Sequence, residues 1–251
     1  MGKVIVIEGS DGSGKATQTK LLYCPEGKYS VKISDKTSTL SYAALNGCYG
    51  ITEALTAQGK KVKMVSYPCY ERDSSALVKM YLQGEFGADP VAVNPYVASS
   101  FFAVDRFASY LKDWKEFYES GEDHIVICDR YVTSNMLHQT AKLDSLEEKL
   151  AFLDWEYDFE FVRGGLPVPE KVFFLDVKPE VTFRLMKDRE NKITHQAKKD
   201  IHESDQAFLV KSYENSMILS KKYGWTKISC CDETDNMKSI EAIHEMIMQQ
   251  L

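Results

Sequence analysis

The chain has 251 residues, of which 44% are hydrophobic, and this is enough for one globular domain with a sizeable core. Its formal net charge of −6 argues against a general nucleic-acid or membrane-surface binder, because such proteins carry a basic surface. The six cysteines form no C-x-x-C pair, which argues against a zinc site. The first residues lack the apolar run of a signal peptide and no stretch reaches transmembrane length, so we expect a cytoplasmic protein with reduced thiols.

Five short apolar segments recur along the chain, with helical patterns between them. They are rich in β-branched and aromatic residues, which is typical of strands buried on both faces. Because strands and helices alternate, the pattern predicts an α/β fold in which helices flank a five-stranded parallel sheet, within a single domain over residues 1–251. The predicted strands are Val4–Glu8, Lys61–Tyr67, His124–Asp129, Lys171–Val177 and Thr226–Cys230.

A glycine-rich loop follows the first predicted strand. Its sequence GSDGSGK fits the pattern G-x-x-x-x-G-K, which binds nucleotide phosphates when it follows a strand and opens a helix. The glycines let backbone N–H groups converge on the phosphates, and the lysine adds a full positive charge. We therefore predict an ATP site on the three-layer fold of P-loop NTPases. The predicted ATP-binding residues are Gly9, Ser10, Asp11, Gly12, Ser13, Gly14, Lys15, Ala16 and Thr17.

Ala16 stands where such loops place the hydroxyl that ligates Mg²⁺. Water or another carboxylate can replace one protein ligand, because bound magnesium keeps several waters. The strand sequence HIVICD ends on Asp129, which should lie beside the phosphates. We expect a rearranged magnesium site that uses Asp129. The alternative is that Asp129 is a loop carboxylate paired with Arg130, and the two interpretations are compatible.

Residues 24–52 interrupt the helix that leaves the phosphate loop. After Leu22 the chain reads YCPEG, and both proline and glycine stop helices. If the segment is removed, Leu22 and Leu55 fall four positions apart on one amphipathic helix. We interpret residues 24–52 as an insertion. It is either a surface excursion without a catalytic role, or a lid, dimer element or regulatory hairpin that a Cys24–Cys48 disulfide could clip.

Further helices are expected in the second half of the chain. Ser145 and Glu148 have the spacing of a capping box at a helix start, and another helix should begin near Pro179. The first of these helices carries an apolar stripe of Leu146, Leu150, Leu153, Tyr157 and Phe161. A C-terminal amphipathic helix is predicted from Met237, Ile240, Ile243 and Ile247.

The chain resembles the thymidylate kinase family of nucleoside-monophosphate kinases over its whole length except residues 24–52. The matching pieces occur in the family's order: EGSDGSGKATQ, the YP of VSYPCYER, FFAVDR, DRYVTSN, LDVKPE and DRENK. The resemblance implies phosphoryl transfer from ATP to dTMP, giving dTDP and ADP for dTTP synthesis. It also implies Mg²⁺ as cofactor, nucleotides as the small-molecule partners, and a homodimer.

The resemblance assigns roles in the acceptor site. Phe102 would stack on thymine while Arg106, four residues on, bonds the base edge. Arg130 would hold the monophosphate, and a guanidinium suits bidentate contact with phosphate. Asp11 would face the sugar 3′-hydroxyl, and Ser134 would lie near the base. The full set of predicted substrate-binding residues is Asp11, Tyr67, Arg72, Phe102, Arg106, Arg130, Ser134, His138 and Gln139.

Simpler interpretations compete with several of these roles. Phe102 could be a core residue, Arg106 could pair with Asp105 on the surface, and Ser134 could cap a helix. The chain also departs from the family pattern. Many relatives have an arginine where Tyr70 stands, and Arg72 could take its place. His138 occupies the position of a tyrosine that packs against the sugar, or it is a satisfied histidine.

A lid is predicted over residues 188–204, a polar stretch without apolar periodicity. Relatives with a glycine at the position of Gly12 use a lid arginine to neutralise charge on the transferring group. Arg184 and Arg189 are the candidates. The predicted catalytic residues are Lys15, Asp129, Arg130, Arg184 and Arg189.

Two other functions stay open from the sequence alone. A deoxynucleoside kinase, or a kinase of another monophosphate, would share the ATP site, and Glu8 could act as the base for a hydroxyl acceptor. A nucleotide-binding sensor with little turnover would account for Ala16 and for the insertion.

Overall fold

The computed structural model describes residues 1–9, 13, 15, 59–192 and 205–251. The proposed insertion, with Cys24 and Cys48, and lid residues 193–204 lie outside this part of the chain. In the described part, no helix is long and apolar enough to cross a bilayer.

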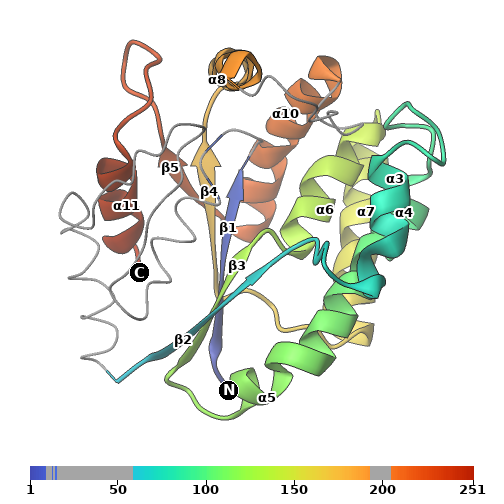
Figure 1. Ribbon diagram of the computed structural model, residues 1–251, viewed down its shortest axis with the longest axis vertical. Helices are drawn as coiled ribbons and strands as arrows, with labels where there is room; N and C mark the ends of the chain where they lie inside the picture. The colour runs from blue at the N-terminus through green and yellow to red at the C-terminus, as the bar shows by residue number, and fades with distance from the viewer. Residues whose placement is uncertain (10–12, 14, 16–58, 193–204) are drawn as a thin grey trace.

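All five predicted strands are present and form one parallel sheet in the order β2-β3-β1-β4-β5 (Figure 1). The prediction of an α/β fold with a five-stranded parallel sheet is confirmed. The strands are β1 (Lys3–Gly9), β2 (Lys61–Ser66), β3 (His124–Asp129), β4 (Lys171–Asp176) and β5 (Thr226–Ser229).

The central strand β1 pairs with both β3 and β4, and its register shows which residues meet at the carboxyl ends of the strands. Ile7 of β1 is level with Asp129 of β3, and Gly9 is level with Leu175 of β4. Because all strands are parallel, their carboxyl ends share this edge. The phosphate loop after β1 and the DRY sequence after β3 therefore start side by side.

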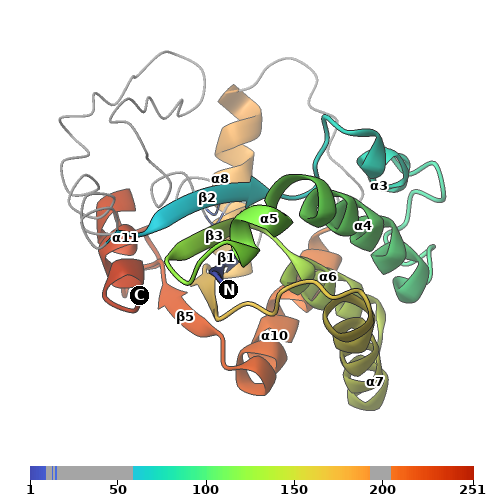
Figure 2. The same cartoon turned by 90° about the horizontal axis from the view of Figure 1, so that it is seen from below.

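Helices cover both faces of the sheet (Figure 2). The α-helices are α3 (Ala76–Leu82), α4 (Pro95–Ser109), α5 (Lys115–Glu119), α6 (Val132–Gln139), α7 (Leu146–Tyr157), α8 (Pro179–Lys192), α10 (Gln206–Tyr223) and α11 (Ile240–Met248). Short helical turns add η2 (Asp73–Ser75), η4 (Thr140–Lys142) and the π-helical η3 (Tyr110–Trp114) and η5 (Asp158–Arg163).

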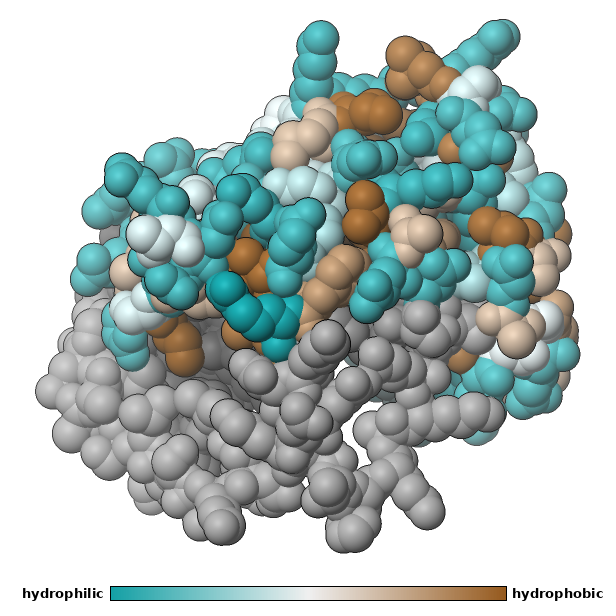
Figure 3. Space-filling view, turned by 90° about the horizontal axis from the view of Figure 1, so that it is seen from above, coloured by the Kyte–Doolittle hydropathy of each residue, from teal (hydrophilic) through white to brown (hydrophobic). Residues whose placement is uncertain are grey.

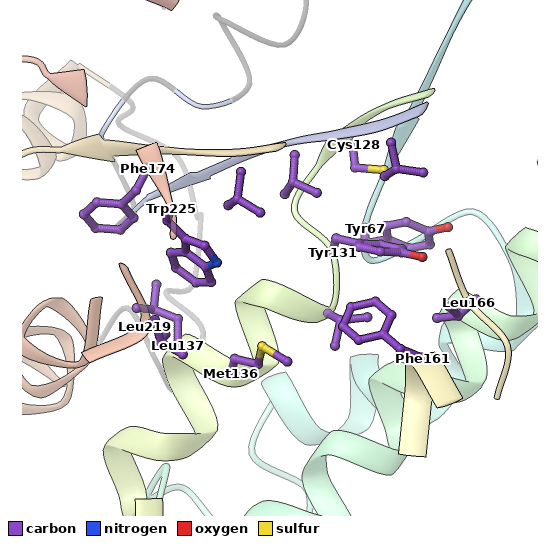
Figure 4. Close-up of a cluster of buried hydrophobic side chains, with 14 of the residues drawn as sticks. Tyr67, Cys128, Tyr131, Met136, Leu137, Phe161, Leu166, Phe174, Leu219 and Trp225 are labelled. Atoms are coloured by element: carbon purple, nitrogen blue, oxygen red, sulfur yellow. The ribbon is translucent and has the colours of Figure 1, made fainter. Parts of the chain in front are cut away.

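Alternate residues of the strands feed two separate hydrophobic clusters, as a pleated strand buried on both faces requires. On one face, Val6 and Cys128 pack with α6, α7 and α10, and Figure 4 shows the aromatic rings of this cluster beneath the strands. On the other face, Ile7 and Ile127 pack with α11 and the start of α8. The sheet is thus the middle of three layers.

The capping box is confirmed, since Ser145 Oγ accepts from Glu148 N–H at 3.1 Å and the Glu148 carboxylate accepts from Ser145 N–H. The predicted apolar stripe of α7 is only partly right. Leu146 is 57% exposed, whereas Glu156, one turn beyond Phe152, is fully buried. The buried carboxyl group of Glu156 has polar partners in the core, Asn135 and Arg106, which are described below.

Candidate functional site

Of the phosphate loop, the structure describes Ser13 and Lys15, and Lys15 contacts the end of β1. Lys15 is buried, and its Nζ donates to the carbonyl oxygen of Gly9 at 2.6 Å. Gly9 has φ +157°, and a Cβ there would lie 2.6 Å from Ser13 Oγ and 3.0 Å from the Leu175 carbonyl oxygen. Only glycine fits this close approach, which starts the turn of the loop.

Asp129 and Arg130 follow β3 at the same edge. Burial raises the pKa of Asp129, and the charges of Arg130 and Lys15 act in the opposite direction. Ser66 adds a hydrogen bond to the Asp129 carboxylate. Arg130 has φ +64°, a left-handed conformation that costs a non-glycine residue about 1 kcal/mol or more and is concentrated at functional sites. Lys15, Asp129 and Arg130 thus lie together at this edge of the sheet.

Glu8 connects the phosphate loop to α6. Its carboxylate is fully buried and accepts from Gly9 N–H at 3.0 Å, Thr133 Oγ1 at 2.9 Å and Ser134 Oγ at 2.7 Å. Hydrogen bonds to a charged acceptor are the strong class, and three of them fix this carboxylate. The Ser134 hydroxyl, which was predicted to lie near the base, is committed to Glu8.

His138 lies between Arg130 and α10. Its Nε2 is 3.3 Å from Arg130 Nη1, and its Nδ1 is 3.3 Å from Ser212 Oγ. The imidazole ring stacks on Phe208, with the two planes 17° apart. Gln139, the next residue, is buried at the end of α6. His138 therefore belongs to the site through Arg130.

Arg106 is buried and paired, but not with Asp105 as the alternative interpretation held. Its Nε donates to Glu160 Oε2 at 2.6 Å, and its Nη2 donates to Glu160 Oε1, a bidentate pair. Its Nη2 also lies 4.0 Å from Glu156 Oε1. Burial alone would lower the pKa of Arg106, but Glu160 and Glu156 raise it.

Glu156 is the second carboxyl group of this buried cluster. Burial, and then the charge of Glu160, raises its pKa well above the ordinary value. Asn135 Nδ2 donates to Glu156 Oε1 at 2.9 Å. Sequence reasoning missed Glu156 and Glu160. The signal was present as two carboxylates four residues apart, Glu156 in α7 and Glu160 in the following η5.

The aromatic residues proposed for the acceptor site lie in different surroundings. Phe102 is half-buried and packs edge-on against Tyr81, with ring centroids 6.0 Å apart. Tyr67 is buried, and its hydroxyl accepts from Trp114 Nε1 at 3.0 Å. Figure 4 shows the rings of Tyr67 and Tyr131 side by side in the core. The side chain of Tyr67 thus faces the core and not the edge of the sheet.

The loop after β2 is held by hydrogen bonds to Asp105 and by an ion pair with Asp113. Asp105, buried in α4, accepts from Cys69 N–H at 2.7 Å and from Ser74 Oγ at 2.6 Å. Arg72, proposed to face phosphate, pairs with Asp113. The interpretation of Asp105 as a surface partner of Arg106 is therefore wrong, because its carboxylate is used to anchor this loop.

Arg184 belongs to α8, a helix that lies above the carboxyl ends of the strands (Figure 1). Its Nη2 donates to the Asp235 carbonyl oxygen at 2.6 Å, in the turn after β5. Arg189 belongs to the same helix by its backbone. The side chain of Arg189 and the predicted residues Ser10, Asp11, Gly12, Gly14, Ala16 and Thr17 lie outside the described part of the chain.

Viewed from above, the described residues present a mostly hydrophilic surface at this edge, with separate hydrophobic spots (Figure 3). Among these residues, no group of three or more His, Cys, Asp and Glu side chains is arranged to hold a metal ion. In the described part of the chain, the Asp129 carboxylate stands next to Lys15 and Arg130, and the charge of the buried Glu8 also acts on it. Magnesium fits such a place, because it is commonly held by one or two carboxylates together with substrate phosphates and water.

Comparison with known proteins identifies the family. The sequence model of the family described as thymidylate kinase matches residues 48–247, which leaves β1 and the phosphate loop outside the match. A protein of Methanococcus aeolicus described as a probable thymidylate kinase is 26% identical over 255 residues, covering 100% of this chain and 96% of that protein. The thymidylate kinase of Caenorhabditis elegans is 30% identical over 183 residues, covering 72% of this chain and 65% of that protein.

A solved structure of thymidylate kinase from Candida albicans superimposes with a TM-score of 0.62, covering 99% of this chain and 90% of that one. Its sequence identity of 18% makes this a likeness of fold alone. The family match spans most of the chain and includes β3, the DRY sequence and the buried Arg106. This chain belongs to the thymidylate kinase family.

Proposed function

We propose that the chain transfers the γ-phosphoryl group of ATP to dTMP, giving ADP and dTDP. The observation that carries this proposal is the meeting of Lys15, Asp129 and Arg130 at the ends of two paired strands. A cation in the phosphate loop and a guanidinium after the neighbouring strand suit two phosphate groups that lie end to end.

In the proposed reaction, an anionic oxygen of the dTMP phosphate attacks the γ-phosphorus of ATP. The bond between that phosphorus and the bridging oxygen breaks, and ADP keeps the oxygen with its electron pair. The nucleophile is already anionic, so no strong general base is needed. Lys15 offsets charge on the donor phosphates, and Arg130 orients the acceptor phosphate by bidentate contact. Bound Mg²⁺, held by Asp129, would neutralise charge on the donor phosphates.

Glu8 bears on the alternative of a deoxynucleoside kinase. A hydroxyl acceptor needs a base that it can reach with a hydrogen bond. The carboxylate of Glu8 is fully buried and already accepts three hydrogen bonds from the protein. This supports a monophosphate acceptor, whose oxygen needs no deprotonation.

The test is a coupled assay of ADP release with dTMP, dUMP, dCMP, dGMP or thymidine as acceptor. A panel is needed because the solved Candida albicans relative is described as having broad substrate specificity. We expect dTMP to give the highest kcat/KM. ADP release that ignores the acceptor would overturn the proposal. Binding of both nucleotides without turnover would favour the sensor.

Arg130→Ala tests the acceptor end of the site. We expect the KM for dTMP to rise and kcat to fall, because orientation and charge are lost together. The matched control is Arg163→Ala, an exposed arginine that pairs with Asp158 on the surface of η5. Equal kinetics for the two variants would contradict the placement of the acceptor phosphate.

The remaining predicted cations are Arg184 and Arg189 on α8. Arg184 already donates to a backbone carbonyl, so we propose Arg189 as the main lid cation. Arg189→Ala should lower kcat more than Arg184→Ala does, with the KM for dTMP little changed.

We also propose a homodimer formed through α4 and η3. Val97, Val104 and Leu111 are 48%, 51% and 67% exposed and follow one another at seven-residue spacing, so they form one apolar stripe. Val104→Asp should shift the mass measured by light scattering from dimer to monomer. Val162→Asp is the control, because Val162 is also exposed and lies on η5. For location we propose the cytoplasm, since the four described cysteines are free, as in a reducing compartment.

A further inference from the structure

We infer that His138 is a positioning residue that holds the guanidinium of Arg130 ready for the acceptor phosphate. The inference rests on the proposed function, because it takes Arg130 as the group that binds this phosphate. It assigns His138 a role through Arg130 instead of direct contact with the sugar.

Arg130, His138 and Ser212 form a chain of two hydrogen bonds, and the chemistry of the groups fixes which atom donates in each. A guanidinium can only donate, so the 3.3 Å contact between Arg130 Nη1 and His138 Nε2 makes Nε2 the acceptor. A neutral imidazole whose Nε2 accepts carries its proton on Nδ1. That N–H faces Ser212 Oγ at 3.3 Å, and the hydroxyl oxygen accepts. The chain of hydrogen bonds therefore runs from Arg130 to His138 and on to Ser212.

The surroundings hold the imidazole ring in this orientation. His138 is 6% exposed, Ser212 is 2% exposed, and Phe208 stacks on the ring. His138 belongs to α6, and both Phe208 and Ser212 belong to α10. The ring is thus clamped between two helices that are themselves part of the core.

A fixed acceptor prepares the Arg130 side chain for binding. An arginine side chain loses rotamer freedom when it is fixed. A partner that restricts the guanidinium before substrate binds removes part of this cost from the binding step. The backbone of Arg130 is already set at φ +64°, and His138 restricts the other end of the residue.

The experiment compares His138→Met, which removes the acceptor, with His138→Gln, which restores one on a side chain of similar reach. The dissociation constant of dTMP is measured by calorimetry, together with the KM for each nucleotide. We expect His138→Met to weaken dTMP binding by about 5- to 10-fold, the net effect of about one ordinary hydrogen bond. The KM for ATP should stay within about twofold, and His138→Gln should recover most of the affinity.

The Arg130→Ala background separates positioning from general damage. If His138 acts through Arg130, adding His138→Met to Arg130→Ala should change dTMP affinity by less than about twofold. His244→Leu, a change at another buried histidine, is the control and should leave dTMP binding unchanged. If His138→Met weakens dTMP binding equally in both backgrounds, or raises the KM values for both nucleotides alike, the inference is wrong.

Ser212→Ala keeps the test decisive if His138→Met does not fold. It removes only the acceptor for Nδ1–H, and we expect a two- to threefold loss of dTMP affinity that disappears in the Arg130→Ala background. No loss, or one that persists there, would overturn the inference. Failure of the proposed function is separate, since it would appear in the unaltered chain as ADP release independent of dTMP.

Discussion

Glu8 in β1 and Ser134 in α6 are 126 residues apart in the chain, and a hydrogen bond of 2.7 Å joins their side chains. The same carboxylate accepts from the backbone N–H of Gly9, where the phosphate loop begins. Glu8 therefore couples the start of the glycine-rich loop to the helix that follows Arg130. The two halves of the site are held together by a buried charge with three donors.

We predict that Ser134→Ala lowers the free energy of unfolding by about 1–2 kcal/mol, because a buried carboxylate loses one of its hydrogen bonds. Urea denaturation measures the change. Ser120→Ala is the control, since Ser120 is exposed at the end of α5 and bonds only a local carbonyl. It should cost less than about 0.5 kcal/mol. Equal losses in the two variants would mean that Glu8 does not depend on Ser134.

Asp105→Ala should release the loop after β2. The carboxylate anchors Cys69 N–H and Ser74 Oγ, and its removal leaves both donors without their partner. We expect a loss of about 2–3 kcal/mol in thermal or urea unfolding, and Asp105→Asn should lose less because its amide oxygen still accepts. Asp158→Ala, on the exposed surface of η5, is the control. A loss from Asp105→Ala no larger than that of the control would contradict the anchoring role.

The fold could be predicted from the sequence because its signals are local. Each strand is a short β-branched run, and Ser145 with Glu148 marks a helix start through contacts three residues apart. The meeting of Lys15 with Asp129 also followed from a general rule, that parallel strands end at one edge. The resemblance to the family added the order of the motifs.

The side-chain partners could not be predicted in the same way. Arg106 pairs with a residue 54 positions later, Glu160, and no local pattern specifies that contact. Asp105 was the nearer carboxylate in sequence, yet successive residues on a helix point in different directions and cannot face each other. Tyr67 likewise turned inward because Trp114 offers its hydroxyl a donor. Such choices depend on tertiary packing.

Substitutions in the buried cluster of Arg106, Glu156 and Glu160 should change stability in opposite directions. Arg106→Met should destabilise the protein by about 3–5 kcal/mol, because it leaves buried carboxyl groups without their cation. Glu160→Gln should also destabilise it, since Arg106 loses its bidentate acceptor. Glu156→Gln should be neutral or stabilising at pH 7. An amide matches the shape of the protonated carboxyl group that burial favours at this position.

The pH dependence of Glu156→Gln follows from the sign of the pKa shift. The pKa of Glu156 is raised well above 4.5 in the folded protein. Above pH 4.5 the unfolded chain therefore releases a proton that the folded protein retains. The unaltered protein therefore loses stability relative to the variant as the pH rises from about 4.5 toward neutrality. Urea denaturation at pH 5 and pH 7 measures the difference. A variant advantage that shrinks as the pH rises would contradict a protonated Glu156.

His244 in α11 gives the opposite pH dependence. It is 1% exposed, and in the described part of the chain neither ring nitrogen has a hydrogen-bond partner. Burial lowers its pKa from 6.5 to about 4, against a small opposing effect of Glu241. Between pH 6.5 and about pH 4 the unfolded chain binds a proton on His244 and the folded protein does not. The free energy of unfolding therefore falls as the pH drops from 6.5, and the loss is complete near pH 4.

His244→Leu should remove this loss. The pKa difference corresponds to at most about 3 kcal/mol, so the variant's advantage over the unaltered protein should grow steadily between pH 7 and pH 4.5. At pH 7 the change should be neutral or stabilising, because a buried imidazole without a hydrogen-bond partner in the described part of the chain is replaced by an apolar side chain. Melting temperatures at several pH values, measured as the difference between the two proteins, cancel the titration of the surface carboxylates. A constant difference across this range would show that His244 titrates normally and is not buried as α11 places it.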